Sequence, residues 1–178
     1  MQRPSSPDPV AEAAAYQQHL LGLLGDDDPA EVQAATSAGL RRSIAEAGDR
    51  LRDRPEPSEW SVLECAGHVA DAEIVYSGRY RWTIAHDEPP LIGYDQDLWV
   101  ERLRHNHDDP EALLAGFEVL RAANLALWAR STEAERARVG QHAERGPESL
   151  DLSFRLIAGH DRFHLGQIRR TLDAFRTR

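Results

Sequence analysis

The sequence predicts an all-α protein, a four-helix bundle with a short leading helix at its N-terminus. Apolar residues recur at steps of three and four along four long segments, which proline, glycine or aspartate residues separate from one another. No segment alternates between apolar and polar residues as a half-buried strand does. Because 178 residues suffice for one core of useful size, we expect residues 1–9 to form a flexible N-terminus and residues 10–178 a single domain.

The first two helices are marked by their apolar spacing and by the residues that end them. The leading helix is predicted over residues 10–24, where Gly25 and three aspartates end the pattern. The next helix is predicted over residues 29–51, although Gly39 and Gly48 weaken its middle and its end.

The next two long helices have clear start signals. Ser61, with Glu64 three residues later, has the pattern of a capping box and opens a helix that reaches about His86. Asp109 followed by Pro110 supplies an N-cap and a first-turn proline for a helix over residues 110–130. A short helical turn is expected at residues 132–138, and the last helix is predicted over residues 149–175.

Composition narrows the function classes. The formal net charge of −9 argues against a nucleic-acid partner, because phosphate-binding surfaces concentrate positive charge. No apolar run approaches the roughly 20 residues of a membrane span, and the polar start lacks the features of a secretory signal. We therefore expect a cytoplasmic protein without a membrane partner. Cys65 is the only cysteine, so a metal ion would be held by histidines and carboxylates.

Two histidines interrupt the apolar face of the last predicted helix. His160 and His164 are one turn apart, among apolar residues such as Ile157 and Ile168. Both rings can point the same way and converge on a point beside the helix, which is how H-x-x-x-H pairs bind a metal ion. The same spacing occurs by chance in many helices, and a histidine on an apolar face is more often a hydrogen-bonded core residue.

A third ligand would come from another helix, and His68 is the natural donor. It lies inside the capped helix, where the small residues Ala66 and Gly67 would allow another helix to approach closely. Three neutral imidazoles leave one or more coordination positions open, as in catalytic rather than structural sites.

The other histidines are predicted not to be ligands. His105 and His107 precede two aspartates and resemble a metal-binding cluster, but we place them in a solvated loop. His19, His86 and His142 lie near the ends of helices or loops, and the helix dipole favours a histidine such as His86 at a helix C-terminus.

Three stretches, residues 59–73, 86–97 and 158–168, resemble the DinB/YfiT-like superfamily, and the likeness extends over residues 10–170. The resemblance implies a four-helix bundle, commonly a homodimer, in which three histidines hold a divalent ion such as zinc or nickel. Carried over to this chain, those ligands are His68, His160 and His164. The resemblance also implies a small-molecule substrate.

The reaction stays open at this stage. An open three-histidine site can activate water for hydrolysis, or it can hold a thiolate for transfer to an electrophile. Members of the superfamily are associated with both activities, and the transferases use low-molecular-weight thiols. The alternative is a metal-stabilised binding or stress-related protein without catalysis. A pocket beside the ion favours an enzyme, whereas a fourth protein ligand without a cavity favours a structural site.

Two polar residues are candidates for orienting the ligands. Asp161 occupies the place of the glutamate in an H-E-x-x-H protease, but its side chain is shorter and the third-ligand pattern differs, so we reject the protease interpretation. Asp161 remains the candidate catalytic residue, acting on a ligand from the outer shell. Asn124 is a second candidate, with a satisfied core amide as the alternative interpretation.

The loop over residues 87–97 is expected to pack beside the metal site and to shape access to it. Pro89, Pro90 and Gly93 disfavour helix there, while Tyr94 and Trp99 supply aromatic surface. The alternative interpretation is a simple connector.

Overall fold

The computed structural model describes residues 12–177, and it confirms a mostly helical fold. The predicted flexible N-terminus at residues 1–9 lies outside the described residues, as does the first part of the expected leading helix. The α-helices are α1 (Ala13–Leu24), α2 (Pro29–Ala47), α3 (Val62–Ala85), α4 (Gln96–Leu103), α5 (Pro110–Arg130), α6 (Glu133–Arg136) and α7 (Leu150–Arg176). Two 3-10 turns, η1 (Gly48–Arg50) and η2 (His105–His107), and three strands, β1 (Pro90–Leu91), β2 (Val139–His142) and β3 (Gly146–Ser149), complete the described elements.

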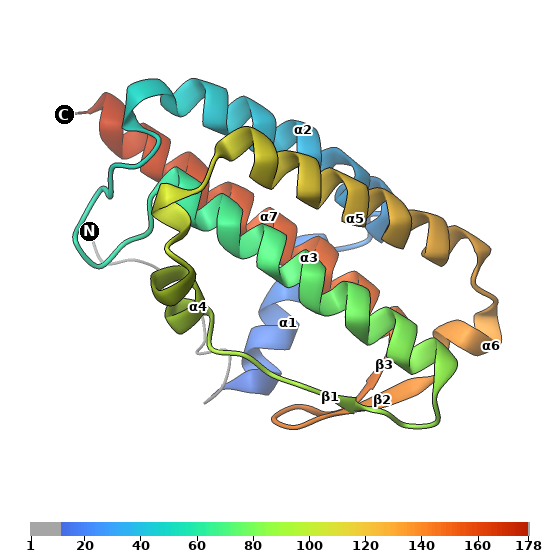
Figure 1. Cartoon of the computed structure of the whole chain (residues 1–178). Coiled ribbons are helices and arrows are strands. Elements are labelled where there is room, and N and C mark those ends of the chain that lie inside the picture. The colour runs from blue at the N-terminus through green and yellow to red at the C-terminus, as the bar shows by residue number, and fades with distance from the viewer. Residues whose placement is uncertain (1–11, 178) are drawn as a thin grey trace.

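The long helices α2, α3, α5 and α7 lie side by side and form the predicted bundle (Figure 1). Helix α7 packs against α2 and α3, and α5 packs against the same two helices from the other side. Helix α1 packs on α7 outside this group. The bundle therefore has α3 and α7, the two helices that carry the selected histidines, as direct neighbours.

Side-chain caps fix where all four long helices begin, and Asp28 is the cap of α2. The Ser61 hydroxyl accepts from the Glu64 backbone N–H, and the Glu64 carboxylate accepts from the Ser61 backbone N–H, which confirms the capping box. Asp109 accepts from the backbone N–H of Glu111 at the start of α5. Ser149 caps α7 in the same way. These starts were readable from the sequence because a cap is a local interaction.

The small β-sheet contradicts the expectation that the chain has no strands. Its strand order is β1-β2-β3, with β1 parallel to β2 and a β2–β3 hairpin in which Val139 pairs with Ser149. The sheet lies at one end of the bundle (Figure 1). The strands have only two to four residues each and include Gly140 and Pro147, so no alternating pattern exists to reveal them.

Helix α4 is the second element that the sequence analysis missed. The expected connection up to Asp109 instead contains this helix, whose N-cap Asp95 accepts from the Leu98 backbone N–H at 2.9 Å. Asp95 was the available signal, because aspartate is a preferred N-cap residue.

Helix α5 also corrects the expectation about membrane-spanning segments. By length and composition alone it is apolar enough to cross a membrane, a property shared by core helices of soluble proteins. Its Arg121 and Asn124 side chains are buried against polar groups of the bundle.

Helices α1 and α7 approach each other closely at Gly159. A Cβ atom at this position would lie 2.1 Å from the Leu20 carbonyl oxygen, which is backbone and cannot swing away. We expect Gly159→Ala to force the two helices apart and to lower the free energy of unfolding by about 1–3 kcal/mol. Urea denaturation measures this change.

Gly116 on α5 is the matched control, because no atom apart from the adjoining backbone of its own helix lies within 4 Å of a Cβ at that position. Gly116→Ala should raise the free energy of unfolding by roughly 0.5–1 kcal/mol, since alanine is the better helix former. Equal effects of the two substitutions would show that the contact with Leu20 does not constrain α1.

Candidate metal centre

His68, His160 and His164 come together inside the bundle, as the sequence analysis predicted. One ring nitrogen from each lies within 4.8 Å of the others. The Nε2 atoms of His68 and His160 are 2.9 Å apart, and the rings are 8% exposed or less. Adjacent turns of α7 supply two of these rings and α3 supplies the third. The H-x-x-x-H spacing thus converges on a point next to α3.

The donor set of this cluster fits a divalent metal ion. Among the described residues, the buried atoms Nδ1 of His68, Nδ1 of His160 and Nε2 of His164 have no hydrogen-bond partner. A buried polar atom without a partner costs free energy, so the unpartnered Nε2 of His164, beside the Nε2 atoms of His68 and His160 that lie 2.9 Å apart, requires explanation. A shared ion that takes one nitrogen from each ring would account for their convergence.

The protonation state of the rings also suits metal binding. Burial lowers the pKa of His68 and His160 well below 6.5, and the neighbouring histidines add to this effect. Burial lowers the pKa of His164 to about 4. The three imidazoles are therefore neutral at pH 7, which is the form that ligates a metal ion.

Two neighbours that the sequence analysis did not select hold the rings in place. The Gln167 side-chain oxygen lies 3.0 Å from Nδ1 of His164. An amide oxygen only accepts, so this contact favours the tautomer with the proton on Nδ1 and leaves Nε2 free as a ligand. Trp60 stacks on His164 with an angle of 17° between the rings, and its ring centre lies 5.0 Å from that of His68. The i,i+3 spacing of His164 and Gln167 was the signal that could have revealed the first contact.

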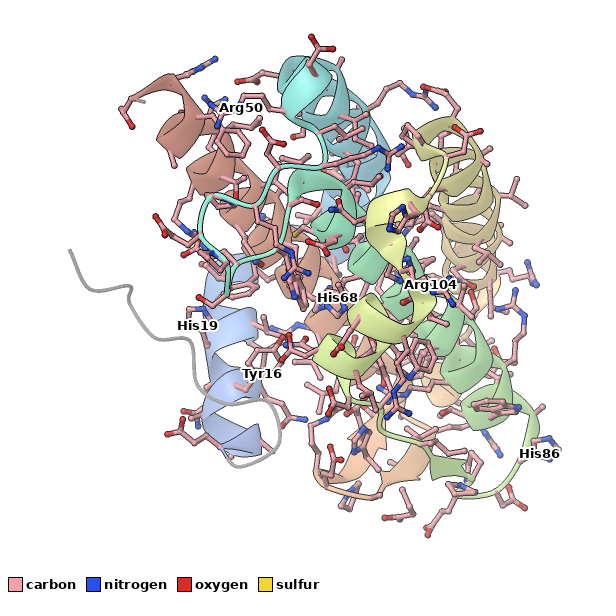
Figure 2. All side chains as sticks on the ribbon, turned by 60° about the vertical axis from the view of Figure 1, so that its left-hand side comes forward. Tyr16, His19, Arg50, His68, His86 and Arg104 are labelled. Carbon is pink, nitrogen blue, oxygen red and sulfur yellow. The ribbon has the colours of Figure 1, made fainter. Side chains whose placement is uncertain are left out.

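A cavity of about 400 Å³ opens beside the cluster, and His68 and His160 are in its wall. Tyr16 and Tyr94 also line the cavity, so α1 and the loop after β1 contribute to it. Figure 2 shows Tyr16 extending from α1 toward the interior that contains His68, while His86 lies at the edge of the molecule. The ring centres of Tyr94 and His68 are 6.3 Å apart, so the predicted loop does pack beside the candidate site.

Asp161 does not contact the histidines directly. Its carboxylate accepts from Nη1 of Arg121 at 2.5 Å and from the Thr36 hydroxyl at 2.7 Å. Arg121 also binds Glu73, so this buried network joins α2, α3, α5 and α7. No hydrogen bond joins Asp161 to a histidine ring in the part of the chain that the structure describes. The described contacts of Asp161 therefore include none through which it would orient a histidine ligand directly.

Asn124 is a satisfied core amide, which was the alternative interpretation. Its amide nitrogen donates to Glu73 and Ser77, and its oxygen accepts from Arg81. All its polar atoms are thus used within the bundle.

The expectation of a solvated loop is wrong for His105, which is 6% exposed. Its Nε2 lies 2.7 Å from Asp71 and its Nδ1 lies 2.7 Å from Asp108. Gly67 makes room for this ring, because a Cβ there would lie 2.5 Å from Cγ of His105. The small residue before His68 therefore admits a histidine ring rather than another helix. His107 is exposed, as expected.

The His105 ion pairs predict a dependence of stability on pH. The hydrogen bond to Asp71 is the main cause that raises the pKa of His105 from 6.5 to about 9, and Asp108 adds to it. A raised pKa stabilises the fold below the unfolded pKa of about 6.5, and this contribution is lost as pH rises through about 9.

His105→Gln should therefore lower the free energy of unfolding by on the order of 2 kcal/mol at about pH 6, with a smaller loss at about pH 10. Urea denaturation of both proteins at the two pH values measures the difference. A loss that is equal at both pH values would contradict a charged His105.

The remaining histidines do not join the cluster. His19 packs edge-on against Phe163, and His86 is exposed at the end of α3. His142 was expected near the end of a loop, but it belongs to β2, is 3% exposed and lines the cavity.

The fold and the cluster define a class of protein, a helical bundle with three histidines that converge next to a cavity. The chain belongs to the DinB superfamily, whose sequence model matches residues 17–168. This match confirms the resemblance that the sequence indicated.

Individual relatives are similar at low sequence identity. The protein named "Putative metal-dependent hydrolase YfiT" from Bacillus subtilis is 23% identical over 140 residues, which are 78% of this chain and 79% of that protein. A protein of Oceanobacillus iheyensis with the same kind of name is 26% identical over 109 residues, 61% of this chain and 63% of its own length.

A solved structure shares the fold. It matches with a TM-score of 0.74 at 19% identity and covers 96% of this chain and 91% of that chain. It is described as "YfiT from Bacillus subtilis is a probable metal-dependent hydrolase with an unusual four-helix bundle topology". The described bundle topology agrees with the arrangement of α2, α3, α5 and α7.

Proposed function

We propose that this protein is a metal-dependent hydrolase that binds one divalent ion through His68, His160 and His164 and acts on a small molecule. The observation that carries the proposal is the convergence of three buried, neutral imidazoles at the wall of a cavity. The names of the two similar bacterial proteins agree with it. Imidazole donors suit zinc or nickel, which we propose as the native metal.

A bound divalent ion would supply Lewis acidity that lowers the pKa of water and polarises a carbonyl or phosphoryl oxygen. The chain itself positions the groups around it. Gln167 keeps the proton of His164 on Nδ1, and Trp60 holds the same ring by stacking. Tyr94, at the cavity wall, limits the space in which a substrate reaches His68. These contacts preorganise the site before substrate binds.

An enzyme is favoured over a purely structural site by two features. Among residues 12–177, the cluster that could hold a metal ion consists of three histidines, without a fourth ligand from His, Cys, Asp or Glu. The adjacent cavity gives a substrate a place to bind.

Cys65 is 1% exposed, and burial raises its pKa, so it is not available as a thiolate. A thiol for S-transfer would therefore have to enter as a substrate.

The first test is metal analysis of protein purified without an affinity tag. Metal-loaded protein is then screened for hydrolysis of ester, amide and phosphoester substrates, and in parallel for transfer of low-molecular-weight thiols. About one equivalent of metal with metal-dependent hydrolysis supports the proposal. Thiol transfer without hydrolysis would replace it with the transferase interpretation, and bound metal without either activity would favour a structural role.

The remaining properties are also proposals, the dimer from the family resemblance and the others from the charge and composition of the sequence. We propose a cytoplasmic homodimer that binds neither nucleic acid nor membranes. Light scattering of the purified protein tests the dimer.

A further inference from the structure

The Arg79 side chain is a buried positive charge without a negative partner. Arg79 and Arg121 are the two buried arginines in the described part of the chain, and each is 2% exposed. Arg121 is neutralised by two carboxylates, Glu73 and Asp161. Arg79 has no carboxylate partner among residues 12–177. Its Nη2 donates to the Ile92 carbonyl oxygen at 2.5 Å, and its buried Nε has no acceptor.

An unpaired buried guanidinium is unfavourable, because arginine stays charged at any pH a protein experiences. Such a group persists where a counter-charge is supplied from outside the chain, as at a binding site.

The His142 ring beside Arg79 meets more hydrogen-bond donors than it can accept from. Nε2 of His142 lies 3.2 Å from Nη2 of Arg79, and its Nδ1 lies 3.2 Å from the Glu144 backbone nitrogen. A neutral imidazole has one accepting nitrogen, so it cannot satisfy both donors. Burial, with Arg145 and Arg79, lowers the pKa of His142 to about 4, so the ring is neutral at pH 7. An added acceptor would balance this group.

Arg79 and His142 line the same cavity as His68 and His160. One molecule in the cavity can therefore be near both the arginine and the histidine cluster. The cavity is also lined by a second arginine, Arg145, which pairs with Glu148, and by three acidic residues: Asp95, Asp97 and Glu144. Their charges would disfavour a ligand with many negative groups, so the surroundings suit a single anionic group.

We propose that Arg79 binds one oxyanion group, a carboxylate or a phosphate, on a small molecule whose reacting end lies at His68, His160 and His164. The identification of this molecule as a substrate rests on the proposed hydrolase function. The contact with Arg79 itself needs no metal ion, because a guanidinium binds oxyanions by charge-assisted hydrogen bonds.

Calorimetric titration of the full-length protein with two probes, inorganic phosphate and propionate, tests this proposal. Propionamide serves as the uncharged control, and ionic strength is held constant. The metal is first removed with a chelator, so that the probes cannot bind to the ion. We expect saturable binding of phosphate or propionate, whichever group the site prefers, and none of propionamide.

Arg79→Gln should weaken binding of the preferred anion by at least about tenfold, since it removes a charged donor. Arg41→Gln is the matched control, because Arg41 is exposed and pairs with Glu111 and Glu118 on the surface. It should leave binding unchanged. If Arg79→Gln does not fold, Arg79→Lys keeps the charge but lacks a donor equivalent to Nε, and binding should still weaken several-fold.

Absence of saturable binding by the parent protein would overturn the proposal, as would unchanged affinity in a folded Arg79 variant. These outcomes are separate from failure of the hydrolase proposal. A protein that binds no metal but shows Arg79-dependent anion binding would retain the anion site and lose the hydrolase. A metal-dependent hydrolase without anion binding would show the reverse.

Discussion

Replacing His68, His160 or His164 with alanine is expected to remove most of the bound metal. Each ring would supply one ligand, and loss of a ligand should cost more than the roughly 10–100-fold in affinity that follows loss of an outer-shell partner. Metal content after dialysis against a metal-buffered solution, measured by elemental analysis, tests this expectation. The metal-dependent activity should fall in parallel.

Double substitutions distinguish a shared ion from three independent core histidines. If His160 and His164 hold the same ion, the second substitution finds little metal affinity left to remove, so the double variant should cost far less than the sum. Additive losses would contradict a shared ion.

His107→Ala is the control, because this side chain is exposed. The neighbouring His105 is not suitable, since it is buried and pairs with Asp71. Metal content should stay at the parental level in this variant. Loss of metal from His107→Ala together with retention in His160→Ala would move the site away from the cluster. Circular dichroism confirms that each variant remains helical.

Replacing Arg121 with methionine is expected to lower the free energy of unfolding by about 3–5 kcal/mol. The side chain is 2% exposed and neutralises Glu73 and Asp161, which are each 1% exposed. Methionine fills similar space but leaves two buried carboxylates without a counter-charge. Urea denaturation at pH 7 measures the loss.

Arg41→Met provides the surface comparison for the same substitution. Arg41 also contacts two carboxylates, but its side chain is 48% exposed, so the expected loss is only about 0–1 kcal/mol. Similar losses at the two positions would contradict the central role assigned to the Arg121 network.

The metal affinity of Asp161→Asn distinguishes a role of Asp161 in orienting a ligand from a role in stabilising the fold. The described contacts of Asp161 are with Arg121 and Thr36 and not with a histidine ring. We therefore expect Asp161→Asn to lower stability while the folded protein keeps parental metal affinity. A fall in affinity of about 10–100-fold at unchanged stability would show that Asp161 does orient a ligand.

Much of the fold was predictable because helix signals are local. The Ser61 capping box, the Asp109 cap and the proline at Pro110 act within one turn, so they mark the same boundaries in the chain and in the structure. The strands escaped prediction because they depend on pairing between distant segments. Leu91 of β1, for example, pairs with His142 of β2, and no local pattern encodes this pairing.

The candidate site, like the fold, was predictable only in part. The spacing of His160 and His164 on one helix indicated convergence, and the place of His68 in the capped helix made it the natural third donor. The resemblance to the DinB superfamily implied the same three ligands. The surrounding groups were not readable. His105 was assigned to solvent because its partners, Asp71 and the space at Gly67, belong to α3 and are brought to it only by packing.

The sequence by itself determined the helical periodicity, the caps and the histidine pattern, since each depends on residues within a few positions of one another. Only the tertiary structure decided that Asp161 binds Arg121, that Gln167 holds the His164 ring, and that Arg79 shares a cavity with the histidines. These depend on which side chains meet after the helices pack. The energy of a buried charge or a hydrogen bond is set by its neighbours in space, and a linear sequence does not specify those neighbours.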